Sequence, residues 1–138
     1  LTGAIANGAT MTKAILKGSD FSKADMVGAT LTGADITNAT LTRADLSSAE
    51  LTKTDLTGTD LTNTVFKKAI LTGAILDETD CTGADFSSAD LVNSQILDAK
   101  VMGAVLGGAK LINSVLEGTL FTASACTGGS GQSPVGRA

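Results

Sequence analysis

Large hydrophobic side chains recur along this chain every five residues, without a single insertion. The row runs from Leu1 to Phe121, and its weakest members are Ala6, Cys81 and Val101. A second row, placed two residues before each following hydrophobic residue, contains only Ala, Ser or Thr. In a helix, each step of five residues would turn the chain by about 140° and scatter the hydrophobic side chains. The pattern therefore excludes an amphipathic helix.

Strand spacing explains why the small and the large residue of each repeat belong together. Residues two apart in an extended chain point to the same side, and the residue between them points to the other. The remaining two residues must turn the chain. The second of them is Gly or Asn at 15 of 25 places, and both accept the positive φ that a type II turn needs at its second central position. Each repeat is thus predicted to be a strand of three residues followed by a corner.

Such units stack into a parallel β-helix when all of them turn the same way. Each coil would pair with its neighbours at about 4.8 Å, the ordinary strand spacing. Coils with three or four sides both fit the pattern. Alternating large and small inward residues would fill a narrow core without voids. The large residues expected in this core include Phe21, Met26, Leu31, Leu41, Leu46, Leu51, Leu61, Phe66, Leu71, Phe86, Leu91 and Leu111.

Composition and charge narrow the classes of function. The chain has 138 residues, enough for one domain, and it contains no His, Trp or Tyr. Residues 20 to 98 hold 13 of the 14 acidic residues against five basic ones, a net charge of −8, which argues against direct nucleic-acid binding. No apolar run approaches the roughly 20 residues of a membrane span, so none is expected.

Nothing in the sequence indicates an active site. The Asp residues lie between the small and the large row and should point outward, whereas a general acid or base needs a cleft and a shifted pKa. With no His, the chain has no plausible nucleophile and base pair and no zinc pattern. Cys81 and Cys126 both lie in the hydrophobic row and are interpreted as small buried hydrophobes. We predict no catalytic residue, no cofactor site and no metal site.

The segments "ADITN", "ADLSS", "TDLTG", "TDLTN", "ADFSS" and "ADLVN" resemble the pentapeptide-repeat family. Its motif is a small residue, Asp or Asn, Leu or Phe, and two variable residues. The resemblance covers residues 1–125 and implies an all-β fold: a right-handed, four-sided parallel β-helix of about six coils with 20 residues each. Residues 126–138 would form a flexible tail, because this end of the chain is rich in Gly and Ser. Cys81 and Cys126 would then lie about 2.25 coils apart, too far for a disulfide unless the tail folds back.

The resemblance implies a non-enzymatic solenoid that acts as a rigid scaffold for contacts with a protein partner, whose identity the sequence does not give. The family is abundant in cyanobacteria and chloroplast thylakoids, which suggests the thylakoid lumen, with the bacterial cytoplasm as the alternative. Some members are acidic rods that mimic DNA and bind DNA gyrase, protecting it from quinolones. The acidic surface for that alternative would include Asp25, Asp45, Asp60, Asp80 and Asp85.

A minor alternative is an ice-binding surface, because Thr ladders on β-helices resemble such surfaces. Ser and Thr also suit turns, which explains them without any ligand. Two corner rows would carry the ladders, one with Thr12, Thr32, Thr52 and Thr72 and the other with Thr2, Ser22, Thr42, Thr62 and Thr82.

Apolar residues also occupy outward positions near both ends of the chain. Exposed together, the C-terminal ones would form a contact patch. Alternatively, the tail or a neighbouring copy covers them, because an open β-helix end must be capped against edge pairing. The N-terminal coil has the same problem at Ile5 and Ile15, so a homo-oligomer formed through a β-helix end is one expectation. The expected contact patch comprises Val92, Leu97, Met102, Val105, Ile112, Val115 and Leu120.

Overall fold

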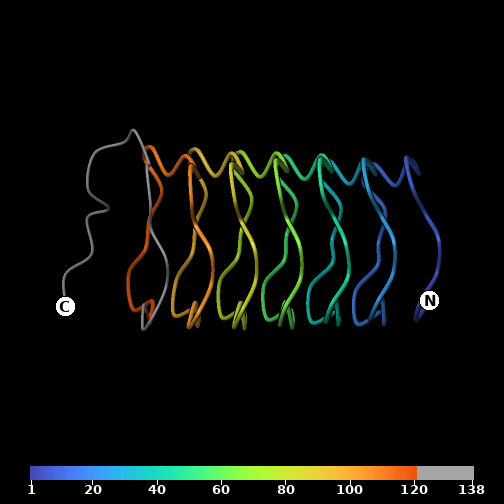
Figure 1. Cartoon of the computed structure of the whole chain (residues 1–138), viewed down its shortest axis with the longest axis horizontal. Helices are drawn as coiled ribbons and strands as arrows, with labels where there is room; N and C mark the ends of the chain where they lie inside the picture. Colours follow the sequence, from blue (N-terminus) through green and yellow to red (C-terminus); the bar gives the residue numbers. More distant parts are fainter. Residues whose placement is uncertain (121–138) are drawn as a thin grey trace.

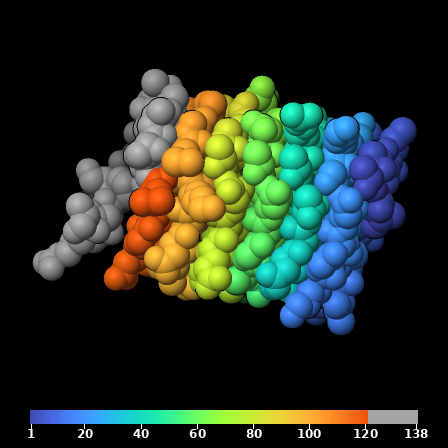
Figure 2. Space-filling model, turned by 90° about the horizontal axis from the view of Figure 1, so that it is seen from below, coloured from blue at the N-terminus to red at the C-terminus, as the bar shows by residue number. Residues whose placement is uncertain are grey.

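A computed structural model describes residues 1–120 of the chain as a rod of stacked coils (Figure 1), which follow one another as bands along the rod in Figure 2. Residues 1–120 contain no helix and no continuous strand. Instead, isolated parallel bridges join residues 20 apart, from Ile5 and Asp25 to Lys100 and Leu120. A bridged residue occurs every five positions, so each coil has four of them, and the described residues make six coils. The predicted end of the β-helix at residue 125 and the tail at 126–138 lie outside the described residues.

Each side of the coil is centred on one bridged residue, and its two neighbours take part in the pairing. The N–H of Asp25 donates to the carbonyl of Ala4 at 2.8 Å, and the N–H of Ala6 donates to the carbonyl of Asp25 at 2.7 Å. The small and the large residue also belong to the turns. In the first repeat, the backbone N–H of Ala4 donates to the carbonyl of Leu1 at 2.9 Å, and most of the later repeats have the same bond. The large residue therefore begins the turn and the small residue ends it. Only the outward residue lies outside the turns, so each predicted strand shares both of its ends with a turn.

Every corner from Gly3 to Gly118 has a positive φ at its second residue, as predicted for the Gly and Asn positions. The same conformation is adopted where the pattern gave no reason to expect it, as at Lys23 (φ 60°) and Arg43 (φ 62°). The corner N–H groups explain this uniformity, since the N–H of Lys23 donates to the carbonyl of Thr42 in the next coil at 2.9 Å. Bonding between coils thus imposes the corner geometry on residues that rarely adopt it alone.

The core is a single column of side chains along the axis of the rod. Leu31, Leu41 and Leu51 have no exposed surface, and the rings of Phe66 and Phe86 stack with centroids 4.9 Å apart. The other large residues expected in the core are buried as well, except Leu111, which is only partly buried. The first coil is less enclosed, and Leu1 is 70% exposed.

Hydroxyl groups within the core bond to the backbone of the preceding coil. Thr54, Thr59 and Thr64 occupy the small row and are buried. Their Oγ1 atoms donate to the carbonyls of residues 23 positions earlier, at 2.8 to 3.1 Å. A buried hydroxyl is costly only when it lacks a partner, so the row accepts Thr in place of Ala.

The 20-residue register sorts the surface into four rows of bridged residues, which we call faces. Each corner row takes the number of the face that it follows, so edge 3 lies between faces 3 and 4. The bridges run from Ile5 to Val105 on face 1, from Thr10 to Lys110 on face 2, from Ile15 to Val115 on face 3 and from Asp20 to Leu120 on face 4.

Candidate interaction surface

The outward Asp side chains bond to the corner that follows them. In each case the carboxylate accepts the backbone N–H of the residue two positions later, as from Ser22 to Asp20 at 2.8 Å. Asp side chains commonly stabilise turns in this way. The aspartates with this bond are Asp20, Asp35, Asp45, Asp55, Asp60, Asp80, Asp85 and Asp90. Their position in the repeat therefore has a structural role, which the sequence reasoning missed.

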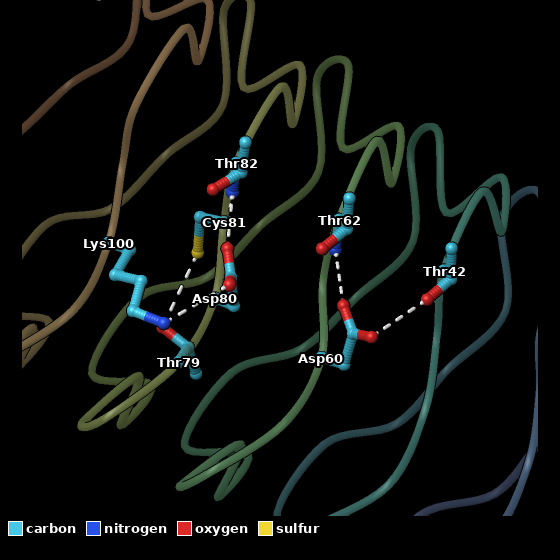
Figure 3. A network of polar contacts seen from close by, with 8 residues as sticks. All are labelled: Thr42, Asp60, Thr62, Thr79, Asp80, Cys81, Thr82 and Lys100. Carbon is cyan, nitrogen blue, oxygen red and sulfur yellow. Dashed lines mark hydrogen bonds and ion pairs between the residues drawn. The ribbon is translucent and has the colours of Figure 1, made fainter. Parts of the chain in front are cut away.

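Figure 3 shows how the second carboxylate oxygen is used on face 4. Asp60 accepts the N–H of Thr62 at 2.9 Å through Oδ1 and the hydroxyl of Thr42, in the preceding coil, at 3.1 Å through Oδ2. Asp80 accepts the N–H of Thr82 and also pairs with Lys100 of the next coil at 3.5 Å. These bonds tie neighbouring coils together.

Two other polar side chains replace the usual bond where it is missing. Asn7 accepts the N–H of Val27 through Oδ1 and donates to Asp25 through Nδ2. Asp77 accepts the N–H of Leu97 at 2.9 Å and also the side-chain amide of Gln95. At these two corners, the N–H group donates to a corner side chain of the preceding coil, because the preceding residue on the face does not accept it.

Hydrogen bonding lowers the pKa of several outward aspartates. The hydroxyl and N–H of Ser22, together with the hydroxyl of Thr2, lower the pKa of Asp20 to about 2. Burial alone would raise the pKa of Asp60, but the hydrogen bonds from Thr62 and Thr42 outweigh it, so the pKa is lowered. The pKa values of Asp80 and Asp85 are lowered by the same balance, with help from a lysine in each case.

The predicted acidic surface is partly neutralised. All five of its members are half-buried. Lys67 pairs with Asp85 at 3.2 Å and Lys100 pairs with Asp80, while Asp90, outside the predicted set, pairs with Lys110. Asp25, Asp45 and Asp60 have no ion pair among the described residues, but they lie on two different faces. The acids therefore do not form one continuous anionic face.

The predicted apolar patch is also divided. Val92 and Ile112 lie on edge 2, Val115 lies on face 3 and Leu97 lies on edge 3, so these four are neighbours. Leu120 lies on face 4, next to edge 3, while Met102 and Val105 lie further around the rod on edge 4 and face 1. Met102, Val105, Ile112, Val115 and Leu120 are exposed, whereas Val92 and Leu97 are half-buried.

The corner residues show a sorting of charge that sequence reasoning did not detect. All four acidic corner residues of the described chain lie on edge 3: Asp77, Glu78, Asp98 and Glu117. The basic corner residues occupy the other three edges, apart from Lys17 in the first coil: Lys13, Lys23, Arg43, Lys53, Lys67 and Lys68. Folding the sequence into rows of every twentieth residue would have revealed this sorting. The rod therefore has one acidic edge in its C-terminal half and three basic edges.

The Thr rows present fewer free hydroxyls than the ice-binding alternative requires. The hydroxyls of Thr2, Thr42 and Thr72 donate to aspartates of the following coil. The Oγ1 atoms of Thr32 and Thr37 are buried and have no hydrogen-bond partner in the described chain. These hydroxyls face the rod, which argues against a flat hydroxyl array on its surface.

No group of residues in the described chain suggests an active site. Cys81 is fully buried, and burial raises the pKa of its thiol to about 12, far from the range of a reactive thiolate. It forms no disulfide with any described residue, and Cys126 lies outside them. A cavity of about 10 Å³ beside Cys81, Phe86 and Val101 is lined only by apolar side chains. Residues 1–120 contain no cluster of His, Cys, Asp or Glu that could hold a metal ion, nor any helix that could cross a membrane.

The fold defines a parallel β-solenoid whose core rows are buried and whose outward rows form the surface. A family model for pentapeptide repeats matches residues 1–33, 31–67 and 66–96, in eight copies. These matches cover more than half of the chain, which therefore belongs to the pentapeptide repeat family. The resemblance noted from the sequence is confirmed.

Several solved structures are similar to this chain. The pentapeptide repeat protein Rfr23 of the cyanobacterium Cyanothece 51142 is 33% identical, with a TM-score of 0.35 and coverage of 70% of this chain and 63% of that protein, less than two thirds of its length. HetL of Nostoc sp. strain PCC 7120, involved in heterocyst differentiation regulation, is 25% identical, with a TM-score of 0.30 and coverage of 92% and 82%. Full-length QnrB1, a plasmid-mediated fluoroquinolone resistance protein, is 16% identical, with a TM-score of 0.35 and coverage of 81% and 67%. No curated protein matches the chain.

Proposed function

We propose that this protein is a non-enzymatic, right-handed, four-sided β-helix that serves as a rigid scaffold for contacts with another protein. The sorting of corner charge is the observation that carries this proposal. Acidic corners gather on edge 3 and basic corners on edges 1, 2 and 4, although the core repeats identically beneath all of them. A partner would therefore meet a different linear array of charge on each edge.

Photo-crosslinking within cells of the source organism tests the scaffold. A photoreactive residue would replace one exposed corner on each edge in turn: Lys68 on edge 1, Lys53 on edge 2, Glu78 on edge 3 and Arg43 on edge 4. We expect a defined adduct with the same partner from one edge or from two neighbouring edges. Folded variants that give no adduct from any edge would contradict the proposal, because all four charge arrays would then be without a partner.

A gyrase-directed DNA mimic is the alternative, and ionised carboxylates along face 4 favour it. Asp60 and Asp80 are bridged in adjacent coils, and the pKa values of both are lowered. The three basic edges oppose it, because a duplex mimic needs negative charge where DNA has phosphates. Gyrase supercoiling measured with increasing amounts of the protein separates the two functions. Activity that is unchanged at stoichiometric excess would eliminate the mimic.

Association through a β-helix end is a separate proposal. The core row of the first coil is incompletely covered, with Leu1 70% exposed and Met11 and Leu16 only partly buried. A second copy placed against this end would cover the three side chains. Light scattering over a range of protein concentrations tests the contact, and a strict monomer at every concentration would argue against it.

A further inference from the structure

We infer that face 3 of the last three coils, residues 61–120, binds a cationic amphipathic helix of a partner protein, with the apolar side of the helix against the rod. This inference rests on the proposed scaffold function and assigns it one surface and one class of partner. Face 3 is the place where apolar side chains on the surface adjoin the acidic edge. Face 4 borders the same edge, but in these coils it carries Asp80 and Lys100 besides Leu120, so its apolar surface is smaller.

The apolar half of this surface comes from neighbouring rows. Ile112 and Val115 are 47% and 50% exposed. Ile75, Val92 and Leu97 are half-buried around them. Ile75 and Val115 lie two coils apart on face 3, with Gln95 between them, while Val92 and Ile112 follow edge 2. We call these five residues the face 3 patch. Contiguous apolar residues of this kind, bordered by charge, mark contact surfaces more often than scattered single ones.

The acidic half is edge 3, which borders the patch along one side. Glu78 and Glu117 are exposed, and neither they nor Asp77 and Asp98 form an ion pair with a described residue. Both side-chain oxygens of Asp77 accept hydrogen bonds, one from the N–H of Leu97 and one from the amide of Gln95. These two bonds hold the carboxylate of Asp77 in a fixed position beside the patch.

Charge and shape together favour a cationic helix over other partners. An anionic segment or a nucleic acid would be repelled by edge 3. One helical turn rises about 5.4 Å and one coil about 4.8 Å, so successive turns of a helix lying along the rod stay near successive coils. An amphipathic helix presents apolar residues three and four positions apart on one side. Its basic side chains, flanking that stripe, would then reach edge 3.

Fluorescence anisotropy with the full chain tests the inference. The probe is a labelled helical peptide of about four turns, built from Leu on one side and Lys on the other, and its charge-reversed partner has Glu in place of Lys. We expect saturable binding of the Lys peptide that weakens as salt is added, and no binding of the Glu peptide. Equal binding of both peptides would overturn the inference, because charge complementarity is part of it.

Two matched pairs of variants locate the binding surface. Val115→Thr on face 3 should weaken binding about fourfold, because it removes roughly the contribution of one buried methyl group to affinity. Val105→Thr, the same change in the same coil on face 1, should leave binding unchanged. Glu117→Gln on edge 3 should weaken binding and reduce its salt dependence, whereas Glu50→Gln on face 2 removes the same charge without effect. Melting curves of all four should match the parent.

Equal effects within either pair would overturn the inference, since binding would then not depend on face 3. Failure of the full chain to bind the Lys peptide would overturn the inference too, whatever covers the face. The scaffold proposal fails separately. An adduct from Arg43 or Lys68 together with no probe binding would keep the scaffold and place its partner on another edge.

Discussion

The first coil and the middle coils have the same repeat in sequence and differ in burial. Leu41 and Leu51 have no exposed surface, whereas Met11, in the same row as Leu51, is only partly buried, and Leu1 is mostly exposed. Both sets occupy identical positions in their repeats. The difference is that a middle coil has a neighbour on each side, whereas in residues 1–120 the first coil has one on a single side.

The comparison shows what a repeat specifies and what it does not. The repeat fixes the direction of each side chain, because direction follows from the local turn. Burial depends on the coils above and below, as the nearest-neighbour energetics of solenoids require. The stability of this protein therefore lies mainly in contacts between coils, and equivalent substitutions should have unequal costs along the rod.

A buried charge gives the largest expected difference. Leu51→Asp should prevent folding, at a cost above about 5 kcal/mol, because an unpaired carboxylate would replace a side chain with no exposed surface. Met11→Asp, the same change in the same row of the first coil, should leave a folded protein of reduced stability. Circular dichroism and urea denaturation measure both. If Leu51→Asp melts like the parent, the inward direction of this row is wrong.

The corner glycines give a smaller difference. A Cβ added at Gly28 meets nothing within 4 Å, whereas one at Gly58 would lie 2.6 Å from Oδ1 of Asn38 in the preceding coil. Both corners have a positive φ, so Gly28→Ala should cost about 1 kcal/mol for the backbone alone. We expect Gly58→Ala to cost more, and Asn38→Gly to remove the excess. Equal unfolding free energies for the two alanine variants would show that contact between the coils contributes nothing at this corner.

Loss of a buried hydroxyl should cost less again. Thr64→Val removes the bond from Oγ1 to the carbonyl of Leu41, which is 2.8 Å long, and keeps the shape of the side chain. The carbonyl still accepts the N–H of Ala44, so we expect a loss of about 1 kcal/mol in unfolding free energy. Thr10→Val, on the exposed surface of the first coil, is the control and should have almost no effect. A neutral result at Thr64 would mean that the row accepts Thr without gaining from its bond.

The pH dependence of stability should show the smallest effect per residue. Asp60 has a lowered pKa in the folded protein, below the value of about 3.9 in an unfolded chain. Such a group stabilises the fold above its unfolded pKa, and this stabilisation is lost as the pH falls through the folded pKa. The melting temperature should therefore fall as the pH is lowered below about 4. Asp60→Asn, which can still accept the N–H of Thr62 but does not titrate, should show a weaker dependence, and identical curves would contradict this role.

Much of the fold could be predicted because the five-residue repeat is strict, so the direction of each side chain follows from its position in the repeat. The inward rows and the positive φ at Gly and Asn corners follow from side-chain size and turn chemistry alone. The positive φ at Lys23 and Arg43 could not be foreseen in this way, because it is imposed by bonds to the next coil. The repeat pattern also does not reveal that the small and large residues belong both to the pairing between coils and to the turns, as the bonds of Ala4 show.

The candidate surface was less predictable than the fold. The sequence identified outward apolar residues but grouped Val105 with Val115, which the register places on opposite faces. From the sequence, the aspartates were expected to form a charged surface. The structure shows that most of them also accept hydrogen bonds from the N–H groups of the corners. The acidic edge requires comparison of residues such as Glu78 and Asp98, which lie 20 positions apart. Local composition around either residue gives no sign of it.

Because every bridge joins residues 20 apart, an insertion or deletion of one five-residue repeat shifts the register of the surface by one side of the rod. Each repeat begins with a core residue that any of the four sides accepts, so removal of five residues would leave the interior intact. Every side chain beyond the deletion would move to the adjacent side of the rod. Deletion of residues 62–66, for example, would bring Glu78 into line with Lys53 instead of Gly58. Surfaces in this architecture can therefore be recombined by quarter turns, and one hydrophobic core can support many arrangements of the same outward residues.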